Sequence, residues 1–300
     1  MNQTTIKGSV RLSGVGLHSG QPVDLVLREA PADSGIVFCR VDLQPAACVR
    51  AHASNVVDTQ LATTLQNDAA KVATVEHLLA ALSGLQIDNV LVELNGPEVP
   101  VMDGSAEPFV LALQSAGSIE LPAPRRYLRV LRAVEVWHGD ARARISPGAG
   151  FSVSYTLLYD HPVFHSHPKH AHIDVNPTTF AAEVSWARTF GFMEDFDRLR
   201  ALKLALGAGF ENVVAVGENQ VLNEGGLRQE DEFVKHKVLD AIGDLMLIGM
   251  PLIGHFEGYK SGHSLNNLLV RQLLAQPDAF EVVAGARLAL DDTPVASAAG

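Results

Sequence analysis

The sequence predicts an α+β protein built from two similar domains, each a mainly antiparallel sheet accompanied by helices. Short runs of alternating hydrophobicity, such as V-D-L-V-L and I-V-F-C-R-V, are separated by turn residues between positions 6 and 65. Helical periodicity follows from about residue 74. The same plan recurs after residue 125, with alternating runs first and helical segments later. We therefore expect two like domains, which could pack helix layer on helix layer.

Length and composition agree with this plan. The 300 residues are 47% hydrophobic and 19% charged, which is typical of a globular protein and allows two domains of about 150 residues each. Closely spaced prolines in L-P-A-P-R-R, residues 121–126, favour extended chain with few donors for a ladder. We place the boundary there, between an N-terminal domain of 1–124 and a C-terminal domain of 125–300. The tail D-D-T-P-V-A-S-A-A-G is expected to be loose.

Charge and hydropathy argue against two classes of protein. The net charge of −11, without a basic patch, argues against nonspecific nucleic-acid binding. The N-terminus has no apolar signal core, and the most apolar run, 241–256, is interrupted by polar residues and a proline, so we expect neither a secretory signal nor a transmembrane segment. Cys39 and Cys48 lack C-x-x-C spacing and read as two structural thiols of a reducing compartment. These features predict a cytoplasmic monomer.

Capping residues place the first two helices. Thr74 is expected to cap V-E-H-L-L-A-A-L, which ends near Gly84. The segment D-G-S-A-E-P-F-V-L-A-L-Q-S-A-G reads as a second helix, with Asp103 or Ser105 at its start and Gly117 closing it. Both helices belong to the first domain.

Four further helices are expected in the second domain, one of them over E-D-F-D-R-L-R-A-L-K-L-A-L. One begins at N-P-T-T-F-A-A-E-V, with Asn176 as its cap and Pro177 at its first position. Another covers about 228–248. A strand, L-I-G-H-F-E-G-Y, separates it from the last helix, H-S-L-N-N-L-L-V-R-Q-L-L-A.

The helix around 228–248 carries a polar stripe. His236, Asp240 and Asp244 recur every four residues and therefore line one helix face, with apolar residues opposite. A solvated face is the ordinary interpretation, but here an imidazole precedes two carboxylates with no basic partner in the row. Gly243 in mid-helix costs about 1 kcal/mol of stability relative to alanine. Its presence indicates that another group approaches the helix backbone closely, and a metal ion or a substrate would fit there. His-x-x-x-Asp offers two ligands to a cation such as Zn²⁺, and a catalytic site needs one more.

A second histidine can supply the missing ligand. Glu76 and His77 place a carboxylate beside an imidazole, as in H-E-x-x-H sites, although the dipeptide is weak evidence and a lone helical histidine is more often structural. V-E-H-L-L-A-A-L-S-G-L and V-K-H-K-V-L-D-A-I-G-D both place His third and Gly seven residues later, a hint of duplication. His77 and His236 would then meet between the domains. His18, in the turn G-L-H-S-G, is not assigned to the site.

Several long blocks resemble a known family. T-V-E-H-L-L-A-A-L, D-N-V-L-V-E-L-N-G-P-E-V-P-V-M-D-G-S-A, A-R-T-F-G-F-M, V-L-N-E-G-G-L-R, D-E-F-V-K-H-K-V-L-D-A-I-G-D-L and Y-K-S-G-H-S-L-N-N occur in this order. Together they resemble the UDP-3-O-acyl-N-acetylglucosamine deacetylases, zinc amidases of lipid A biosynthesis in Gram-negative bacteria. The resemblance covers nearly the whole chain except the tail. It implies two α+β domains with their helices between two sheets.

The resemblance also implies roles for the site residues. Zinc would be bound by His77, His236 and Asp240, leaving a position for water. Glu76 would be the general base that takes a proton from the water attacking the acetamide.

The resemblance also implies a second catalytic group. His263 would act as an imidazolium that stabilises the oxyanion and protonates the departing amine. Asp244 would orient His263 and favour its charged form. Thr189 matches the oxyanion donor of the family.

The implied substrate is a UDP-linked, acylated N-acetylglucosamine. Phe190 and Phe192 would line an apolar passage for the 3-O-acyl chain, with core packing as the alternative. Lys237 would contact the headgroup, plausibly a phosphate. Family members often read L-G-G-S where this chain has L-G-A-G, so the passage near Ala208 departs from the family pattern.

Two rival functions remain open on the sequence. A zinc amidase acting on another amide would use the same ligands, because these specify hydrolysis better than they specify the sugar. A binding module that kept the fold but lost the chemistry would not need the paired base and acid of Glu76 and His263. Peripheral contact with the inner membrane also stays open, since the chemistry is lipid-related but no strongly basic amphipathic helix is present.

Overall fold

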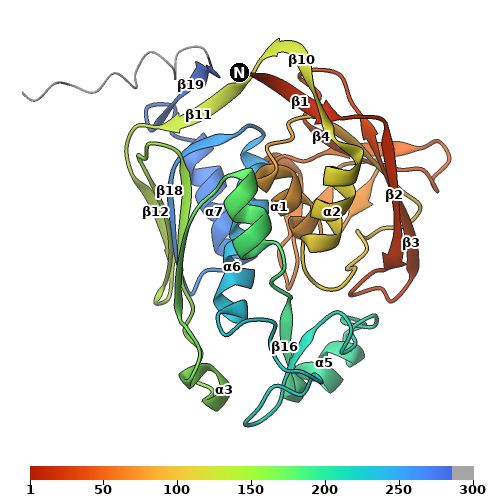
Figure 1. The fold of residues 1–300 in the computed structure, drawn as a ribbon, viewed down its shortest axis with the longest axis vertical. Coiled ribbons are helices and arrows are strands. Elements are labelled where there is room, and N and C mark those ends of the chain that lie inside the picture. The colour runs from red at the N-terminus through yellow and green to blue at the C-terminus, as the bar shows by residue number, and fades with distance from the viewer. Residues whose placement is uncertain (286–300) are drawn as a thin grey trace, which may run out of the picture.

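Two sheets enclose a layer of helices in the computed structural model, which describes residues 1–285 (Figure 1). The red to yellow N-terminal half lies on one side of Figure 1 and the green to blue C-terminal half on the other, with helices α1, α2, α6 and α7 between their sheets. The α+β fold expected from the sequence is therefore confirmed. The tail that was expected to be loose lies outside the described residues.

The N-terminal half is organised around a five-stranded sheet. Its strands, in spatial order, are β2 (Ser9–Val15), β3 (Pro22–Glu29), β9 (Val90–Leu94), β4 (Ile36–Arg40) and β5 (Ala47–Arg50). Only the β4–β9 pair is parallel. Val23, Leu25 and Leu27 alternate with less buried residues along β3, as expected for a strand with one face on the core.

Smaller ribbons complete this half. A three-stranded sheet contains β6 (Val56–Asp58), β7 (Thr64–Gln66) and β8 (Lys71–Val72), and β1 (Asn2–Ile6) pairs with β10 (Ser118–Pro124). The segment 121–126 was expected to lack a ladder, but β10 extends as far as Pro124. The next strand, β11 (Arg126–Val130), pairs within the C-terminal sheet instead. The assignment of 1–124 and 125–300 as domains remains a prediction.

The C-terminal half contains a seven-stranded sheet. Its main path is β12 (Val134–His138), β13 (Ala141–Ser146), β18 (Leu252–Tyr259), β11 and β19 (Phe280–Ala284), and β14 (Phe151–Thr156) joins β18 to β15 (His170–Asp174). The strand L-I-G-H-F-E-G-Y expected from the sequence is β18. Because β18 pairs with three strands, it anchors this sheet.

Helices fill the space between the sheets. They are α1 (Glu76–Gly84), α2 (Glu107–Ala116), α4 (Pro177–Thr179) with η2 (Phe180–Val184), α6 (Glu232–Leu245) with η4 (Met246–Ile248), and α7 (His263–Leu274). A projecting lobe at one end carries β16 (Phe190–Phe192), η3 (Met193–Asp195), α5 (Phe196–Ala201) and β17 (Val214–Val216), with α3 (Pro162–His165) nearby (Figure 1). The short turn η1 (Ala53–Asn55) precedes β6.

The helix caps agree only partly with the sequence. Asn176 caps α4 in a capping box with Pro177 at the start, and Gly117 closes α2 at φ 72°, as expected. Ser105 receives a hydrogen bond from the backbone nitrogen of Glu107 at the start of α2. Thr74 does not cap α1, because its hydroxyl donates to the buried Glu98 carboxylate instead.

Helix α6 is buried on nearly all sides. His236, Asp240 and Asp244 are at most 3% exposed, so the polar stripe faces the interior of the protein. Gly243 does mark a close approach, but its neighbour is α1: a Cβ at this position would overlap the carbonyl oxygen of Glu76. The expected metal or substrate contact at this glycine is therefore wrong, and helix–helix packing explains the residue.

The two cysteines do not remain free thiols. Cys39 on β4 and Cys48 on β5 are directly opposite in antiparallel register, and they form a disulfide. The expectation of two structural thiols was wrong because Cys spacing along the chain does not reveal which residues face each other across a hairpin.

Candidate metal centre and active site

Helices α1 and α6 bring the two histidines of the related segments together. The ring centroids of His77 and His236 lie 5.1 Å apart and their planes are nearly perpendicular, at 86°. Each histidine lies near the start of its helix, and the absence of a side chain at Gly243 allows the helices to approach closely. The sequence prediction that these histidines meet is therefore correct.

Asp240 completes a group of three buried metal-ligand side chains. Its Oδ1 lies 3.6 Å from His77 Nε2 and 3.4 Å from His236 Nε2. One ligand atom from each residue lies within 4.8 Å of the other two, and no other such group occurs in residues 1–285. Asp240 Oδ1 is buried without a hydrogen-bond partner, which a bound cation would satisfy. The residues present therefore fit a metal ion.

The protonation of the group also suits metal binding. His236 Nδ1 lies 3.1 Å from the Ala187 carbonyl oxygen, which fixes the ring so that Nε2 faces Asp240. Burial lowers the pKa of His236 to about 3, so the imidazole is neutral at pH 7. Burial alone would raise the pKa of Asp240, but its polar neighbours, among them the Lys237 ammonium in contact with it, hold the pKa well below its usual value. Neutral imidazole and ionised carboxylate are the ligand forms that metals require.

Glu76 lies on one side of this group, at the start of α1. Its Oε2 accepts a hydrogen bond from the Thr63 backbone nitrogen at 3.0 Å, and its Oε1 lies 3.9 Å from His263 Nε2. Burial raises the pKa of Glu76 above its usual value. A carboxylate whose pKa is raised is a stronger base than an exposed one.

His263 lies beside Glu76 and is held by Asp244. His263 Nδ1 lies 2.9 Å from Asp244 Oδ2, while Nε2 faces Glu76 and lies 4.0 Å from Asp240 Oδ2. Burial would lower the pKa of His263, but Asp244 outweighs it and raises the pKa to about 9. His263 is therefore a cation at neutral pH, with Nε2 directed toward the centre of the site.

Two further residues hold Asp244, and the sequence analysis missed both. Thr63 donates its hydroxyl to Asp244 Oδ1 at 2.7 Å, and Asn266 donates its amide to Oδ2 at 2.9 Å. Asn266 follows His263 by three residues on α7, so helical spacing could have identified it. Thr63 lies 181 residues from Asp244 in the chain, and no local signal connects them.

His18 also belongs near the site, although the sequence analysis did not assign it. Burial lowers the pKa of His18; the Glu98 carboxylate opposes this shift, and the nearby charge of His263 adds to it. Glu98 accepts hydrogen bonds from the backbone nitrogens of His18 and Ser19, which fixes this turn. The His18 carbonyl accepts a bond from Leu206, so the turn also meets the segment that follows α5.

The remaining predicted residues border His236. The Ala187 carbonyl oxygen contacts Nδ1 of the His236 ring, and the ring centroids of Phe190 and His236 lie 6.2 Å apart. The segment from Ala187 to Phe190 therefore begins and ends beside His236. Thr189 lies in this segment, fixed by backbone hydrogen bonds to Gly104 and Val214. Thr189 therefore lies in the chain between two residues that border His236, and its role as an oxyanion donor remains a proposal.

Phe190 and Phe192 belong to an aromatic cluster beyond the metal group. Phe190 lies 5.1 Å from Phe233 and Phe192 lies 5.3 Å from Tyr159, between ring centroids, and Phe164 contacts all four. Phe233 is buried, whereas Phe190 and Phe192 are only partly buried. This exposure leaves part of each ring available to a ligand.

Lys237 lies on the rim of the group. Its Nζ contacts Asp240 Oδ2 at 2.5 Å. Burial would lower the pKa of Lys237, but Asp240 and Tyr155 raise it, so the side chain is cationic. An ammonium group has three donors, and the contact with Asp240 uses one of them.

Comparison with known proteins agrees with this geometry. Residues 3–275 match the family model described as UDP-3-O-acyl N-acetylglycosamine deacetylase. The chain belongs to this family. Proteins named UDP-3-O-acyl-N-acetylglucosamine deacetylase from Pseudomonas entomophila and Hahella chejuensis are 56% and 55% identical to it over 283 residues. These alignments cover 94% of this chain and 93% and 94% of the relatives.

A third family member gives the same result. The protein of that name from Marinobacter nauticus is 55% identical over 283 residues, with 94% of this chain and 93% of the relative covered. The family resemblance expected from the sequence is confirmed. Within residues 1–285, no helix has the length and apolar character needed to cross a membrane.

Proposed function

We propose that the protein is a zinc-dependent deacetylase in lipid A biosynthesis. Its substrate would be UDP-3-O-(3-hydroxyacyl)-N-acetylglucosamine, and hydrolysis of the acetamide would give the free amine and acetate, an early committed step of that pathway. The family membership supports a deacetylase. The observation that carries the proposal is a buried His-His-Asp group with an acid–base pair, Glu76 and His263, beside it.

His77, His236 and Asp240 would hold the zinc ion. Two imidazoles and one carboxylate form a ligand set of the kind found in catalytic zinc sites, which keep one position open. When bound, zinc supplies Lewis acidity to the acetamide carbonyl and activates water as a nucleophile.

Glu76 is the proposed general base. The hydrogen bond from Thr63 holds one carboxylate oxygen, and the other faces the centre of the site. In that position it takes a proton from the attacking water as the new C–O bond forms. The raised pKa of Glu76 makes it a stronger base than an exposed glutamate.

His263 is the proposed general acid. The Asp244 contact keeps it protonated at neutral pH, and Nε2 points toward the reacting group. The cation stabilises the developing oxyanion, with Thr189 as a further donor. As the C–N bond breaks, the departing nitrogen takes the His263 proton and acetate is released.

The partly buried aromatic rings suit an acyl chain. We assign Phe190 and Phe192 to the passage for the 3-O-acyl group, because they form an apolar surface next to His236 and are not fully covered. Lys237 is assigned to the headgroup, since two of its donors remain for an anionic oxygen. We further propose a cytoplasmic monomer that meets the inner membrane only peripherally.

Acetate release tests the proposal. Purified protein should release acetate from the acylated substrate, lose activity with a chelator and regain it with added zinc. UDP-N-acetylglucosamine without the acyl chain should be deacetylated far more slowly, because binding energy from the chain is absent. Equal rates on both compounds would contradict the assigned substrate, and activity that survives removal of all metal would contradict the zinc mechanism.

A further inference from the structure

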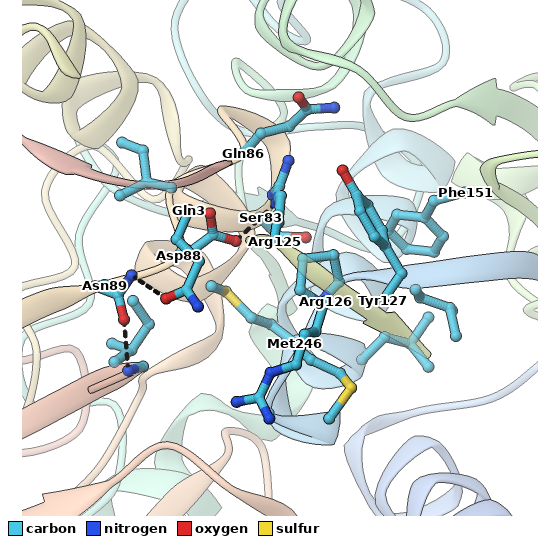
Figure 2. A pocket seen from close by; sticks show the side chains of 18 of the residues that line it. Gln3, Ser83, Gln86, Asp88, Asn89, Arg125, Arg126, Tyr127, Phe151 and Met246 are labelled. Atoms are coloured by element: carbon cyan, nitrogen blue, oxygen red, sulfur yellow. Dashed lines mark hydrogen bonds and ion pairs between the residues drawn. The ribbon is translucent and has the colours of Figure 1, made fainter. Parts of the chain in front are cut away.

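A second cavity lies between the two halves of the protein, away from the metal centre. Its volume is about 420 Å³, within the range of small-molecule sites, and none of the site residues described above lines it. It borders Ser83 near the end of α1 and Leu245 at the end of α6, whereas His77 and His236 lie near the starts of those helices. Figure 2 shows side chains that line it, from β1, α1 and β11 among other elements.

One wall of the cavity is polar and positively charged. Its lining includes three arginines, Arg50, Arg125 and Arg126, and two aspartates, Asp33 and Asp88, a net charge of +1 in a chain whose net charge is −11. The Arg125–Asp88 ion pair, at 2.8 Å and marked in Figure 2, is buried, and its two charges cancel. The net positive charge therefore comes from the other three charged residues, Arg50, Arg126 and Asp33.

Arg50 and Arg126 have donors to spare. Arg126 pairs with Asp33 at 2.9 Å, but both side chains are more than half exposed. Arg50 donates to the main-chain carbonyl of Asp33, and within residues 1–285 it has no carboxylate partner. Each guanidinium carries five N–H donors, so together they can receive an acidic group in a forked arrangement.

The other wall is apolar. It includes Phe151, Met246, Met250 and Ile253, and the first three are partly buried side chains packed against the core. Methionines have flexible, polarizable side chains and adapt to ligands of irregular shape. The pocket opens to solvent where Arg50 and Arg126 are exposed, so a ligand can enter it.

We propose that this cavity binds a small amphiphile that carries one acidic group. The acid lies between Arg50 and Arg126, and the apolar body lies against Phe151, Met246 and Met250. A fatty carboxylate and an alkyl phosphate share this chemistry. Because the lining comes from both halves of the chain, the bound molecule also bridges them.

Methyl resonances of methionine can test the site directly. The chain has five methionines: Met246 and Met250 line the cavity, whereas Met193 follows Phe192 at the catalytic end. Full-length, zinc-loaded protein with ¹³C-labelled methionine methyls is titrated with decanoate, decyl phosphate or neutral decanol, below micelle-forming concentrations. Met246→Leu and Met250→Leu assign the two resonances.

We expect at least one of the two acids, decanoate or decyl phosphate, to shift the Met246 and Met250 methyl resonances saturably. The acid that binds more tightly shows whether the natural acidic group is a carboxylate or a phosphate. Decanol should bind about 10-fold more weakly, which corresponds to about 1.4 kcal/mol. Arg50→Gln with Arg126→Gln should weaken binding of the acid by a similar factor and leave decanol unchanged. Arg11→Gln with Arg132→Gln, at two exposed positions outside the cavity, is the matched control for two lost charges.

A blocking variant separates this site from the acyl passage. A Cβ at Gly150, which lines the cavity, would meet no atom within 4 Å, so Gly150→Phe can fill the space. It should abolish the Met246 and Met250 shifts while acetate release stays at the wild-type rate. Shifts confined to Met193, unchanged binding in Gly150→Phe, or equal affinity for decanol and both acids would overturn the proposal.

Discussion

His263 Nδ1 lies 2.9 Å from Asp244 Oδ2, and both side chains are at most 9% exposed. Two other residues, Thr63 and Asn266, donate to the same carboxylate, so Asp244 cannot turn away from the imidazole without losing three contacts. This arrangement keeps His263 charged although it is buried, since an uncompensated cation there would lose its proton.

The charge of His263 predicts the alkaline limit of activity. Because the proposed acid must be protonated, kcat/KM should fall as pH rises through about 9. Asp244→Asn removes the main stabilising charge, so the alkaline limb should move to lower pH. Asp160→Asn, at a fully exposed carboxylate, should leave the profile unchanged. If the alkaline limb stays at the same pH in Asp244→Asn, His263 is not the group whose deprotonation produces it.

The same pair should affect stability. The folded-state pKa of His263 is raised from 6.5 to about 9, so its contribution to the free energy of unfolding is fully present below pH 6.5 and is lost as pH rises through about 9. Urea unfolding of the wild type and of Asp244→Asn across this interval measures the difference.

Removal of the proposed base should slow the reaction without releasing the metal. Glu76→Gln keeps the side-chain shape but cannot accept a proton, and rates commonly fall about 100-fold to 10,000-fold when a positioned acid or base is lost. Zinc content should remain that of the wild type, because Glu76 is not one of the three proposed ligands. Glu135→Gln, at an exposed position on β12, controls for loss of a carboxylate. A rate within a few-fold of the wild type would exclude Glu76 as the base.

Close packing of α1 against α6 should depend on Gly243. In Gly243→Ala, the new methyl would overlap the Glu76 carbonyl oxygen, so the helices must move apart. Overpacking of this kind costs about 1–3 kcal/mol, and it should also displace Glu76 and lower kcat. Gly150→Ala, where a methyl meets open space, is the matched control. Thermal unfolding measures the loss of stability, and acetate release measures the loss of activity. Wild-type stability in Gly243→Ala would show that α1 and α6 can accommodate a methyl group between them.

Phe192 can be assigned to the passage or the core by comparison with a core ring. Phe233→Ala should lose about 3–5 kcal/mol of stability, because that side chain is 1% exposed. Phe192→Ala should lose less and instead raise KM for the acylated substrate. A large fall in melting temperature with unchanged KM would identify Phe192 as a core residue.

The polar stripe shows which parts of the site can be predicted from sequence. Spacing alone placed His236, Asp240 and Asp244 on one helix face, and the repeated His-to-Gly interval paired His77 with His236. Periodicity could not decide whether the stripe faced solvent or the interior, because that depends on the residues packed above it. In the structure, α1 covers it at Gly243.

Features that depend on contacts between distant parts of the chain could not be predicted from the sequence. Thr63 reaches Asp244 across 181 residues, and Cys39 faces Cys48 only because of the register between β4 and β5. Glu98 captures the Thr74 hydroxyl that local preference assigned to a helix cap. In each case a partner distant in sequence competes with the local interaction, and local patterns carry no information about it.

Metal content measured with and without one ligand tests the central claim most directly. Wild-type protein should contain about one tightly bound zinc ion per chain by elemental analysis, and His236→Ala should lose both the metal and acetate release. The circular dichroism spectrum of His236→Ala should still show a folded protein, and His172→Ala, at an exposed histidine on β15, should keep both metal and activity. Full zinc content and turnover in His236→Ala would contradict the assignment of the metal centre.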